Sequence, residues 1–249
     1  MILSDNSLEP ARSALAHDKH KNPITGHVSR NLHSSSKNIS VHNSSNVYIE
    51  GGSGIHISDS KGVRITSAKD LFVHNSNNIT IHRSYNISVN HSKAISLYQS
   101  NDVCIYRSGD VSLKNCHSVS SHHSNDVPIE KSNRISLYQS DDVFVDHCND
   151  LSLCQSEDVS IHQSKAISCY ESNDVSINPS TDVSLEYCND VLLHWSADVS
   201  LKKTSNISVY WSEDIFLKHS DHIYVYKANS VSLEYSHNVT VRHSNEPDH

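Results

Sequence analysis

The sequence contains no long run of apolar residues and no basic start followed by an apolar segment. A helix needs about 20 apolar residues to cross a bilayer, so we expect no membrane span. The N-terminus, MILSDNSLEPARSALAHDKH, does not have the form of a standard signal peptide. We therefore expect an intracellular product, a virion component or a chain exported by a non-classical route.

Charged and hydrophobic residues are both scarce, at 19% and 36% of 249 residues, and Ser, Asn and His fill the gap. Such polarity is typical of disorder, but disordered chains lack β-branched residues at regular spacing. Here Val and Ile recur at fixed positions. The formal net charge of −8 argues against a nucleic-acid partner. We also expect no cofactor.

What the sequence does have is a repeat of eight residues. From Ser76 to His243 it divides without a gap into 21 octads, and looser octads extend back to Ser36. With the positions numbered 1 to 8, position 1 is Ser in 16 octads, and position 4 is Val, Ile or Leu in all 21. Position 6 is aliphatic except at Ser121 and Cys169, and position 3 is Asp in 11 octads.

Each octad reads as one short strand and one bend. Apolar positions 4 and 6 around a polar position 5 indicate a half-buried strand. Asn and Asp at positions 2 and 3 favour a bend, because they tolerate left-handed backbone. Since no octad can bury its apolar face alone, the sequence predicts an all-β, single-stranded parallel β-solenoid over residues 36–243. Residues 1–35 would precede it as a possible cap, and residues 244–249 would form a tail.

The octads also indicate a size for the coil. At a spacing of 24 residues, position 5 is Ser without exception from Ser88 to Ser232. Position 3 is Asp from Asp102 to Asp198 at the same spacing. These columns predict three octads per coil, a triangular section and about 8 to 9 coils. Side-chain amides would then form a ladder along the stack at Asn101, Asn125 and Asn149.

The phrase N-[VI]-[ST]-[IVL] on such a coil resembles the right-handed parallel β-helices of the pectate-lyase-like superfamily. It occurs, for example, at Asn78 and Asn86, and the resemblance covers about residues 36–243. It implies a right-handed coil. Members of that superfamily include polysaccharide lyases and hydrolases, viral tailspikes and adhesins. This chain lacks the long inserted loops that build the enzymes' clefts, so no catalytic residue is assigned.

The ends and the cysteines carry further expectations. The segment from Ser7 to His17 could form a short helical cap, and the open C-terminal coil end could dock a partner. No C-x-x-C pair exists, so neither a zinc ribbon nor a disulfide framework is indicated. Four cysteines fall at inward or small positions and are expected in the core: Cys116, Cys148, Cys169 and Cys188. Cys104 and Cys154 fall at outward positions.

Outward apolar residues define a candidate partner surface. Phe144, Leu192 and Phe216 stand at position 5 of one predicted side, with Trp195 close by at position 8. Apolar patches on a polar surface commonly mark a protein partner or self-association. Permanent cover by residues 1–35 is the structural alternative.

Two smaller candidate sites follow from the predicted coil. Tyr187, Trp211 and Tyr235 would form an aromatic ladder that could stack on sugar rings or simply shield a bend. His122, His123 and His147 would lie on adjacent coils and could bind Zn²⁺ or Ni²⁺, although twenty His make chance clusters common.

These features favour a non-enzymatic rod that is structural, self-assembling or adhesive and works by presenting a surface. A carbohydrate-binding or polysaccharide-processing β-helix is the alternative. Catalysis is disfavoured because the Asp columns follow corners and no cleft is indicated. Ice binding is a minor alternative, since long charged groups at position 7 would interrupt the flat Ser column.

Overall fold

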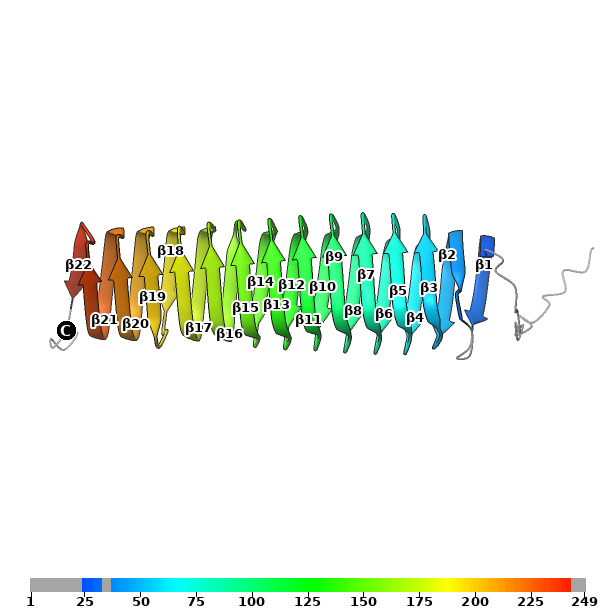
Figure 1. The fold of residues 1–249 in the computed structure, drawn as a ribbon, viewed down its shortest axis with the longest axis horizontal. Coiled ribbons are helices and arrows are strands. Elements are labelled where there is room, and N and C mark those ends of the chain that lie inside the picture. The colour runs from blue at the N-terminus through cyan, green and yellow to red at the C-terminus, as the bar shows by residue number, and fades with distance from the viewer. Residues whose placement is uncertain (1–23, 33–36, 243–249) are drawn as a thin grey trace, which may run out of the picture.

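The chain forms a long rod of stacked parallel β-strands (Figure 1). The computed structural model describes residues 24–32, as backbone alone, and residues 37–242. The proposed helical cap from Ser7 to His17 and the tail 244–249 lie outside the described residues. None of the described residues belongs to a helix that is long and apolar enough to span a bilayer.

The strands form two facing sheets, which we name face A and face B. Face A contains β4 (Lys61–Thr66), β6 (Asn77–His82), β8 (Lys93–Tyr98), β10 (Gly109–Lys114), β12 (Asn125–Glu130), β14 (Asp141–Asp146), β18 (Asn189–His194) and β22 (Val239–Arg242). Face B contains β3 (Ser53–Ser58), β5 (Lys69–His74), β7 (Tyr85–Asn90), β9 (Asn101–Tyr106), β11 (His117–His122), β13 (Asn133–Tyr138), β15 (Asn149–Cys154) and β19 (Val199–Lys202).

Five longer strands bend from one face to the other: β2 (Ser40–Glu50), β16 (Val159–Tyr170), β17 (Asn173–Glu186), β20 (Ser205–Lys218) and β21 (Asp221–Glu234). The remaining strand, β1 (Ile24–Leu32), pairs with β2. Two edges connect the faces. Edge 1 leads from face B to face A and comprises residues 43–46 and the equivalent residues of each later coil, up to 235–238. Edge 2 leads from face A back to face B and comprises residues 51–54 and their equivalents, up to 227–230.

The predicted coil of three octads is wrong, because stacked residues are 16 apart. Val127 pairs with Val143, and Ile167 pairs with Val183. The rod therefore has about 13 turns of about 16 residues, with two octads per turn and two faces instead of three. The predicted amide ladder of Asn101, Asn125 and Asn149 is wrong for the same reason, since Asn125 lies on edge 1 and the other two lie on edge 2. Asn149 instead donates to Asn133, one coil away, at 2.9 Å.

A second left-handed residue in each octad explains the smaller coil. Left-handed backbone occurs at position 3, as expected, but also at position 8, as in Asn115 (φ 53°) and Ser118 (φ 54°). Two such residues within four reverse the chain, so one edge turns it fully back. The bend at positions 2 and 3 alone would have turned it only part of the way.

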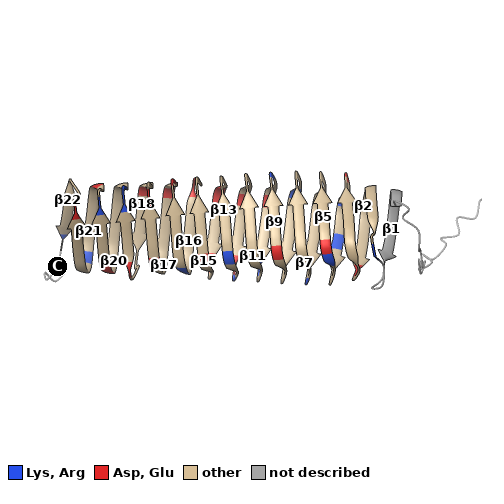
Figure 2. Ribbon diagram, in the orientation of Figure 1, with Lys and Arg blue, Asp and Glu red and all other residues tan. Residues whose placement is uncertain are grey.

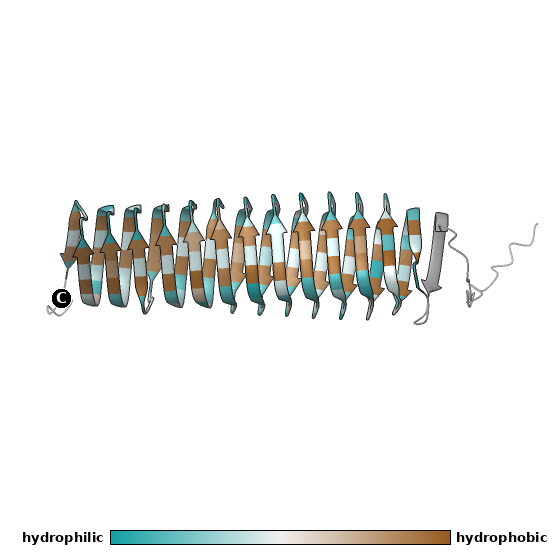
Figure 3. Cartoon of the chain, viewed as in Figure 1, coloured by the Kyte–Doolittle hydropathy of each residue, from teal (hydrophilic) through white to brown (hydrophobic). Residues whose placement is uncertain are grey.

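The core lies between the two faces and follows the predicted pattern. Residues at positions 4 and 6 are buried, as Val111 and Leu113 illustrate, and the hydropathy bands of Figure 3 alternate along each strand. The four cysteines expected in the core are buried, and Cys104 is exposed. Burial raises the pKa of the Cys148 thiol to about 11, so this group is an uncharged thiol at neutral pH.

Position 1 is buried as well, where the narrow edge admits only small side chains. The Ser hydroxyls there satisfy the backbone of the turn. Ser76 Oγ donates to the His74 carbonyl at 2.9 Å and accepts the Ser60 N–H, one coil earlier, at 3.1 Å. The sequence indicated a small residue at this position, but not this pair of hydrogen bonds.

Candidate functional site

Edge 2 departs from the regular geometry over residues 179–230. Up to Ala166, both position 8 and position 3 are left-handed in every coil of this edge from residue 51 onward. Pro179 then occupies position 8, where its ring holds φ near −65° and excludes a left-handed backbone. In the three following coils, position 3 is no longer left-handed, at Asp198, Asp214 and Ser230. Strands β17, β20 and β21 therefore run through this edge, the lower one in Figure 1.

Two tryptophans stack on this irregular part of edge 2. Trp195 and Trp211 occupy position 8 of consecutive coils, with ring centroids 5.0 Å apart and planes inclined by 23°. Lys227 places its ammonium group 5.6 Å from the centre of the Trp211 ring, on the next coil. Trp195 is 56% exposed, the more exposed of the pair. Its coil is preceded by that of Pro179, so the aromatic stack ends at Trp195.

A hollow of about 350 Å³ follows edge 2 beside the tryptophan pair. Thr181 and Ala197 have short side chains at its floor, and Pro179 and Trp195 line it at position 8. Four polar side chains also reach it: Gln163, Lys165, Thr181 and Glu213. Within the described residues none of these four side chains takes part in a hydrogen bond or an ion pair. They are therefore available to a ligand.

The irregular backbone leaves buried polar atoms without partners. The hydroxyls of Ser196 and Ser212, at position 1 of edge 2, and Nδ1 of His194 have no hydrogen-bond partner among the described residues. Ser196 also lines the hollow. Buried polar atoms without partners cost stability, so this part of edge 2 is less well satisfied than the regular coils.

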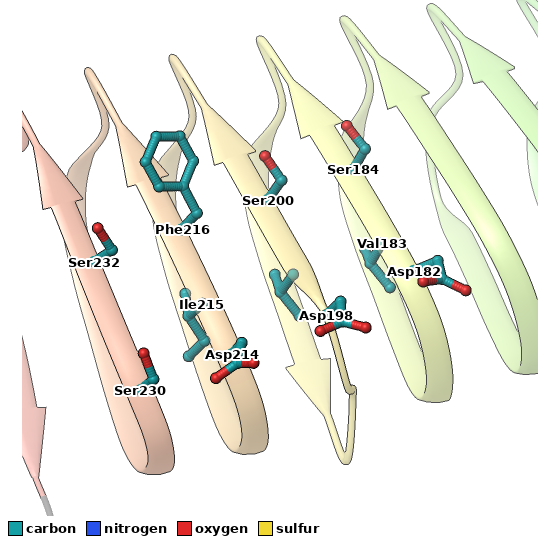
Figure 4. Close-up of a pocket in the computed structure, with 11 residues that line it drawn as sticks. Asp182, Val183, Ser184, Asp198, Ser200, Asp214, Ile215, Phe216, Ser230 and Ser232 are labelled. Atoms are coloured by element: carbon teal, nitrogen blue, oxygen red, sulfur yellow. The ribbon is translucent and has the colours of Figure 1, made fainter.

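A second hollow, of about 470 Å³, lies around the same edge on face B (Figure 4). Asp182, Asp198 and Asp214 form a row along one side of it. Ser184, Ser200 and Phe216 form a parallel row further along the strands. Stacked strands lie about 4.8 Å apart, so the three carboxylates line one side of a strip that runs along the rod.

The predicted partner surface is exposed, but it is not one stripe. Phe144, Leu192, Trp195 and Phe216 are all exposed. Phe144 and Leu192 lie on face A, three coils apart, whereas Phe216 lies on face B, because the true coil has 16 residues. Leu192, Trp195 and Phe216 therefore surround the irregular part of edge 2, and Phe144 stands apart.

The predicted aromatic ladder is wrong. Tyr187 and Tyr235 lie on edge 1, three coils apart, and Trp211 lies on edge 2. Tyr187 instead contacts Tyr170, with ring centroids 5.5 Å apart, and Tyr235 stacks on His219 at 5.1 Å. Trp211 is part of an aromatic stack, but with Trp195, which the sequence had assigned to the partner surface.

The predicted metal site is also wrong. His122 and His123 lie at the edge 1 end of β11, while His147 follows β14 on edge 2. The described residues contain no group of three or more potential ligands that could hold a metal ion. His147 and His162 instead both contact Asp146 Oδ1, at 2.8 and 3.3 Å. Burial raises the pKa of Asp146, but hydrogen bonds from the two imidazoles outweigh it and lower the pKa.

Charged residues also pair along the rod, one coil apart. Lys114 contacts Glu130 at 2.7 Å, and Lys202 contacts Glu186 at 2.7 Å. The hydrogen bond from Lys114 lowers the pKa of Glu130. Such exposed pairs contribute little stability, about 0 to 1 kcal/mol each. Acidic residues gather along edge 1, at the top of Figure 2, where position 3 is Asp in six consecutive coils from Asp110 to Asp190.

The last described coil leaves its inward face partly open. Leu233, at inward position 6, is 49% exposed, and Val231, Val239 and Val241 are only partly buried. This is the coil end at which the sequence predicts docking, and docking there stays a prediction.

Comparison with known proteins gives a similarity of architecture. No family model and no curated protein matches the sequence. Among solved structures, the A-module of mannuronan C-5 epimerase AlgE4 from Azotobacter vinelandii is 11% identical, with a TM-score of 0.41 and coverage of 88% of this chain and 89% of that one. The surface adhesin PfbA of Streptococcus pneumoniae is 8% identical, with a TM-score of 0.36 and coverage of 83% and 85%.

An exopolygalacturonase from Thermotoga maritima is 11% identical, with a TM-score of 0.31 and coverage of 84% and 72%. All three TM-scores lie below 0.5. The chain is thus a parallel β-solenoid that resembles pectate-lyase-like β-helices in general architecture. The right-handed coil implied by that resemblance stays a prediction, and the function has to be argued from the site itself.

Proposed function

We propose that this chain is a non-enzymatic adhesive rod that binds an extended partner through the irregular part of edge 2. The observation that carries the proposal is the coincidence of three features over residues 163–232. Both hollows, the stacked tryptophans and the break in the left-handed turns all lie there. A rigid stack of coils holds such a surface in a fixed geometry, which lowers the entropic cost of binding.

The electrostatics of the carboxyl groups support a binding role over catalysis. Glycoside hydrolysis requires one carboxylic acid with a raised pKa and a second carboxylate across the scissile bond. The carboxyl groups whose pKa departs clearly from its ordinary value are Glu130, Asp146 and Asp221, and all three depart downward. Asp182, Asp198 and Asp214 line one side of their hollow in a single row. This row is the feature that favours polysaccharide processing as the second candidate function.

The test compares an edge variant with a matched control. Trp195→Ala combined with Phe216→Asp disrupts both hollows. Tyr85→Ala combined with Phe144→Asp removes two equally exposed aromatic rings from regular coils. Retention on plates coated with polysaccharides, extracellular-matrix proteins or the protein itself is measured by biolayer interferometry. We expect at least one coating to retain the protein, the edge variant to lose retention about tenfold or more, and the control to stay within about twofold.

Three results would contradict the proposal. Equal retention of the edge and control variants would show that binding occurs elsewhere. The absence of retention on every coating would remove the adhesive role. Release of reducing or unsaturated sugar from a polysaccharide would favour the processing alternative, and its loss in Asp198→Asn would assign the activity to the row of aspartates. Sedimentation of the Phe216→Asp variant separates self-association from binding to another molecule.

A further inference from the structure

We infer that the hollow beside Trp195 is a subsite for a neutral polysaccharide, with one sugar ring stacked on the indole. The inference rests on the proposed function, since it names the chemical class of the partner at that same edge. It concerns a residue pair that the sequence had separated, Trp195 and Trp211. The observations that carry it are the aromatic platform, the free polar side chains around it and the local charge.

The aromatic platform has one side available. Trp211 covers one face of Trp195, with centroids 5.0 Å apart and an interplanar angle of only 23°. The following ring of the stack, Trp211, is in turn approached by Lys227. On the opposite side of Trp195 lies the coil of Pro179, and the hollow opens there. A flat, partly apolar ring of ligand can therefore lie against the indole without displacing a side chain.

The hollow has the mixed chemistry that a sugar requires. A pyranose presents apolar C–H groups on its faces and hydroxyl groups around its rim. Trp195 and Pro179 match the faces, while Gln163, Thr181 and Glu213 offer acceptors and donors to the rim. The volume of about 350 Å³ lies at the lower end of the range for small-ligand sites.

The direction of the hollow favours a chain of sugars over a single one. Lys165 and Glu213 stand at position 2 of edge 2, three coils apart, with Thr181 and Ala197 between them. At about 4.8 Å per coil this strip is about 14 Å long. It continues along the rod instead of closing around a ligand, so an extended polysaccharide can lie along it.

The local charge favours a neutral polysaccharide over an acidic one. Asp182, Asp198 and Asp214 follow edge 2 on its face B side, and Glu213 lines the hollow itself. Lys165 is the one basic residue that lines it. The chain as a whole carries a formal charge of −8. Uronate carboxylates would lie within a few residues of this acidic row and be repelled by it.

Intrinsic fluorescence tests this inference directly. The protein has two tryptophans, and both line the hollow, so their emission reports on this site alone. The full chain is titrated with neutral hexasaccharides of glucose, mannose and N-acetylglucosamine, and with hexagalacturonate and hexamannuronate. We expect at least one neutral ligand to shift or quench the emission, and the acidic ligands to bind at least tenfold more weakly at low salt.

Variants separate the platform from the fold. Trp195→Ala is expected to weaken binding about tenfold or more, with Trp211 as the remaining reporter. Ala197→Leu fills the floor of the hollow and keeps both tryptophans, so it provides the same test if Trp195→Ala alters the strand signal in circular dichroism. Tyr85→Ala removes an aromatic ring of similar exposure from a regular coil of edge 2 and is expected to leave the Kd within about twofold.

The outcomes distinguish this inference from the proposed function. If no neutral sugar changes the emission while the edge variant still loses retention on a protein coating, the sugar subsite is wrong and the binding edge stands. If retention is also unchanged, both are wrong. Tighter binding of hexagalacturonate than of every neutral ligand would overturn the charge argument. Unchanged affinity in both Trp195→Ala and Ala197→Leu would place sugar binding elsewhere.

Discussion

The two edges of the rod are built from the same octads, yet they differ in regularity. From residue 43 onward, edge 1 has left-handed residues at positions 8 and 3 in every coil up to Asn238. Edge 2 keeps this geometry only to Ala166 and loses part of it in each coil from Pro179 to Ser230. On edge 1 the buried Ser hydroxyls are bonded, as at Ser76, whereas Ser196 and Ser212 on edge 2 have no partner.

This difference separates the part of the molecule that maintains the stack from the part available for binding. A regular edge satisfies its own backbone groups and offers only a repeated polar surface. The irregular edge tolerates unpartnered hydroxyls, places two exposed tryptophans side by side and opens two hollows. Natural proteins concentrate such local departures at functional sites, which supports the assignment of binding to edge 2.

The largest expected effect comes from transferring the proline to a regular coil. Asn115 occupies position 8 of edge 2 with φ 53°, and its N–H donates to the Glu130 carbonyl at 2.9 Å. Proline can neither adopt this φ nor donate this bond. We expect Asn115→Pro to lower the free energy of unfolding by about 3 kcal/mol or more, measured by urea denaturation followed by circular dichroism.

The reverse substitution is the control. Pro179→Asn places a residue that tolerates left-handed backbone at the start of the irregular region. Nothing in the local hydrogen bonding is lost, because proline has no N–H to donate. We expect a change of about 1 kcal/mol or less. If Asn115→Pro were as mild, proline would not explain why edge 2 changes at residue 179.

A smaller effect is expected from removing a buried hydroxyl on each edge. Ser76→Ala on edge 1 leaves the Ser60 N–H and the His74 carbonyl without their partner, at a cost of about 1 to 3 kcal/mol. Ser196→Ala on edge 2 removes a hydroxyl that bonds to nothing, so we expect no loss or a slight gain. Thermal denaturation of the two variants gives the comparison. Equal losses would mean that the hydroxyls of edge 2 are satisfied in solution.

Much of the fold could be predicted from the sequence, because inward and outward positions alternate in every octad. Val111 and Leu113 were placed in the core by that pattern alone, and they are buried. The size of the coil could not be predicted this way, because octads with one shared pattern give coherent columns at any multiple of eight. The decisive signal was present at a spacing of 16, where Asp runs unbroken from Asp110 to Asp190 and Ser from Ser120 to Ser200.

The candidate site was predicted only in fragments. Its exposed residues Leu192, Trp195, Trp211 and Phe216 were all identified, but the coil of 24 residues distributed them over the wrong sides. Pro179 and the row Asp182, Asp198 and Asp214 were missed. The sequence does signal Pro179, because it is the one proline at position 8 between Ser76 and His243. Its meaning depends on knowing that position 8 is left-handed, which Gln, His, Arg and Trp at that position do not reveal.

The smallest expected effect concerns the aspartates of the regular edge. Asp142 on edge 1 has Asp126 and Asp158 at the same position in the coils before and after it. Two carboxylates about 4.8 Å apart repel each other by about 0.9 kcal/mol in a water-like dielectric. Asn keeps the left-handed backbone and removes the charge. We expect Asp142→Asn to raise the free energy of unfolding by about 1 kcal/mol at low salt.

Asp102 on edge 2 is the matched control, because it has the same left-handed backbone but lies between Asn86 and Ser118. Asp102→Asn should therefore leave the stability unchanged within a few tenths of a kcal/mol. Urea denaturation of both variants at low salt and in about 1 M NaCl, where the screening length falls to about 3 Å, completes the test. The gain in Asp142→Asn should shrink with salt because it arises from repulsion between exposed charges. A gain of equal size in Asp102→Asn, or one that salt does not reduce, would mean that the amide itself stabilises the turn and that the aspartate row of edge 1 carries no electrostatic cost.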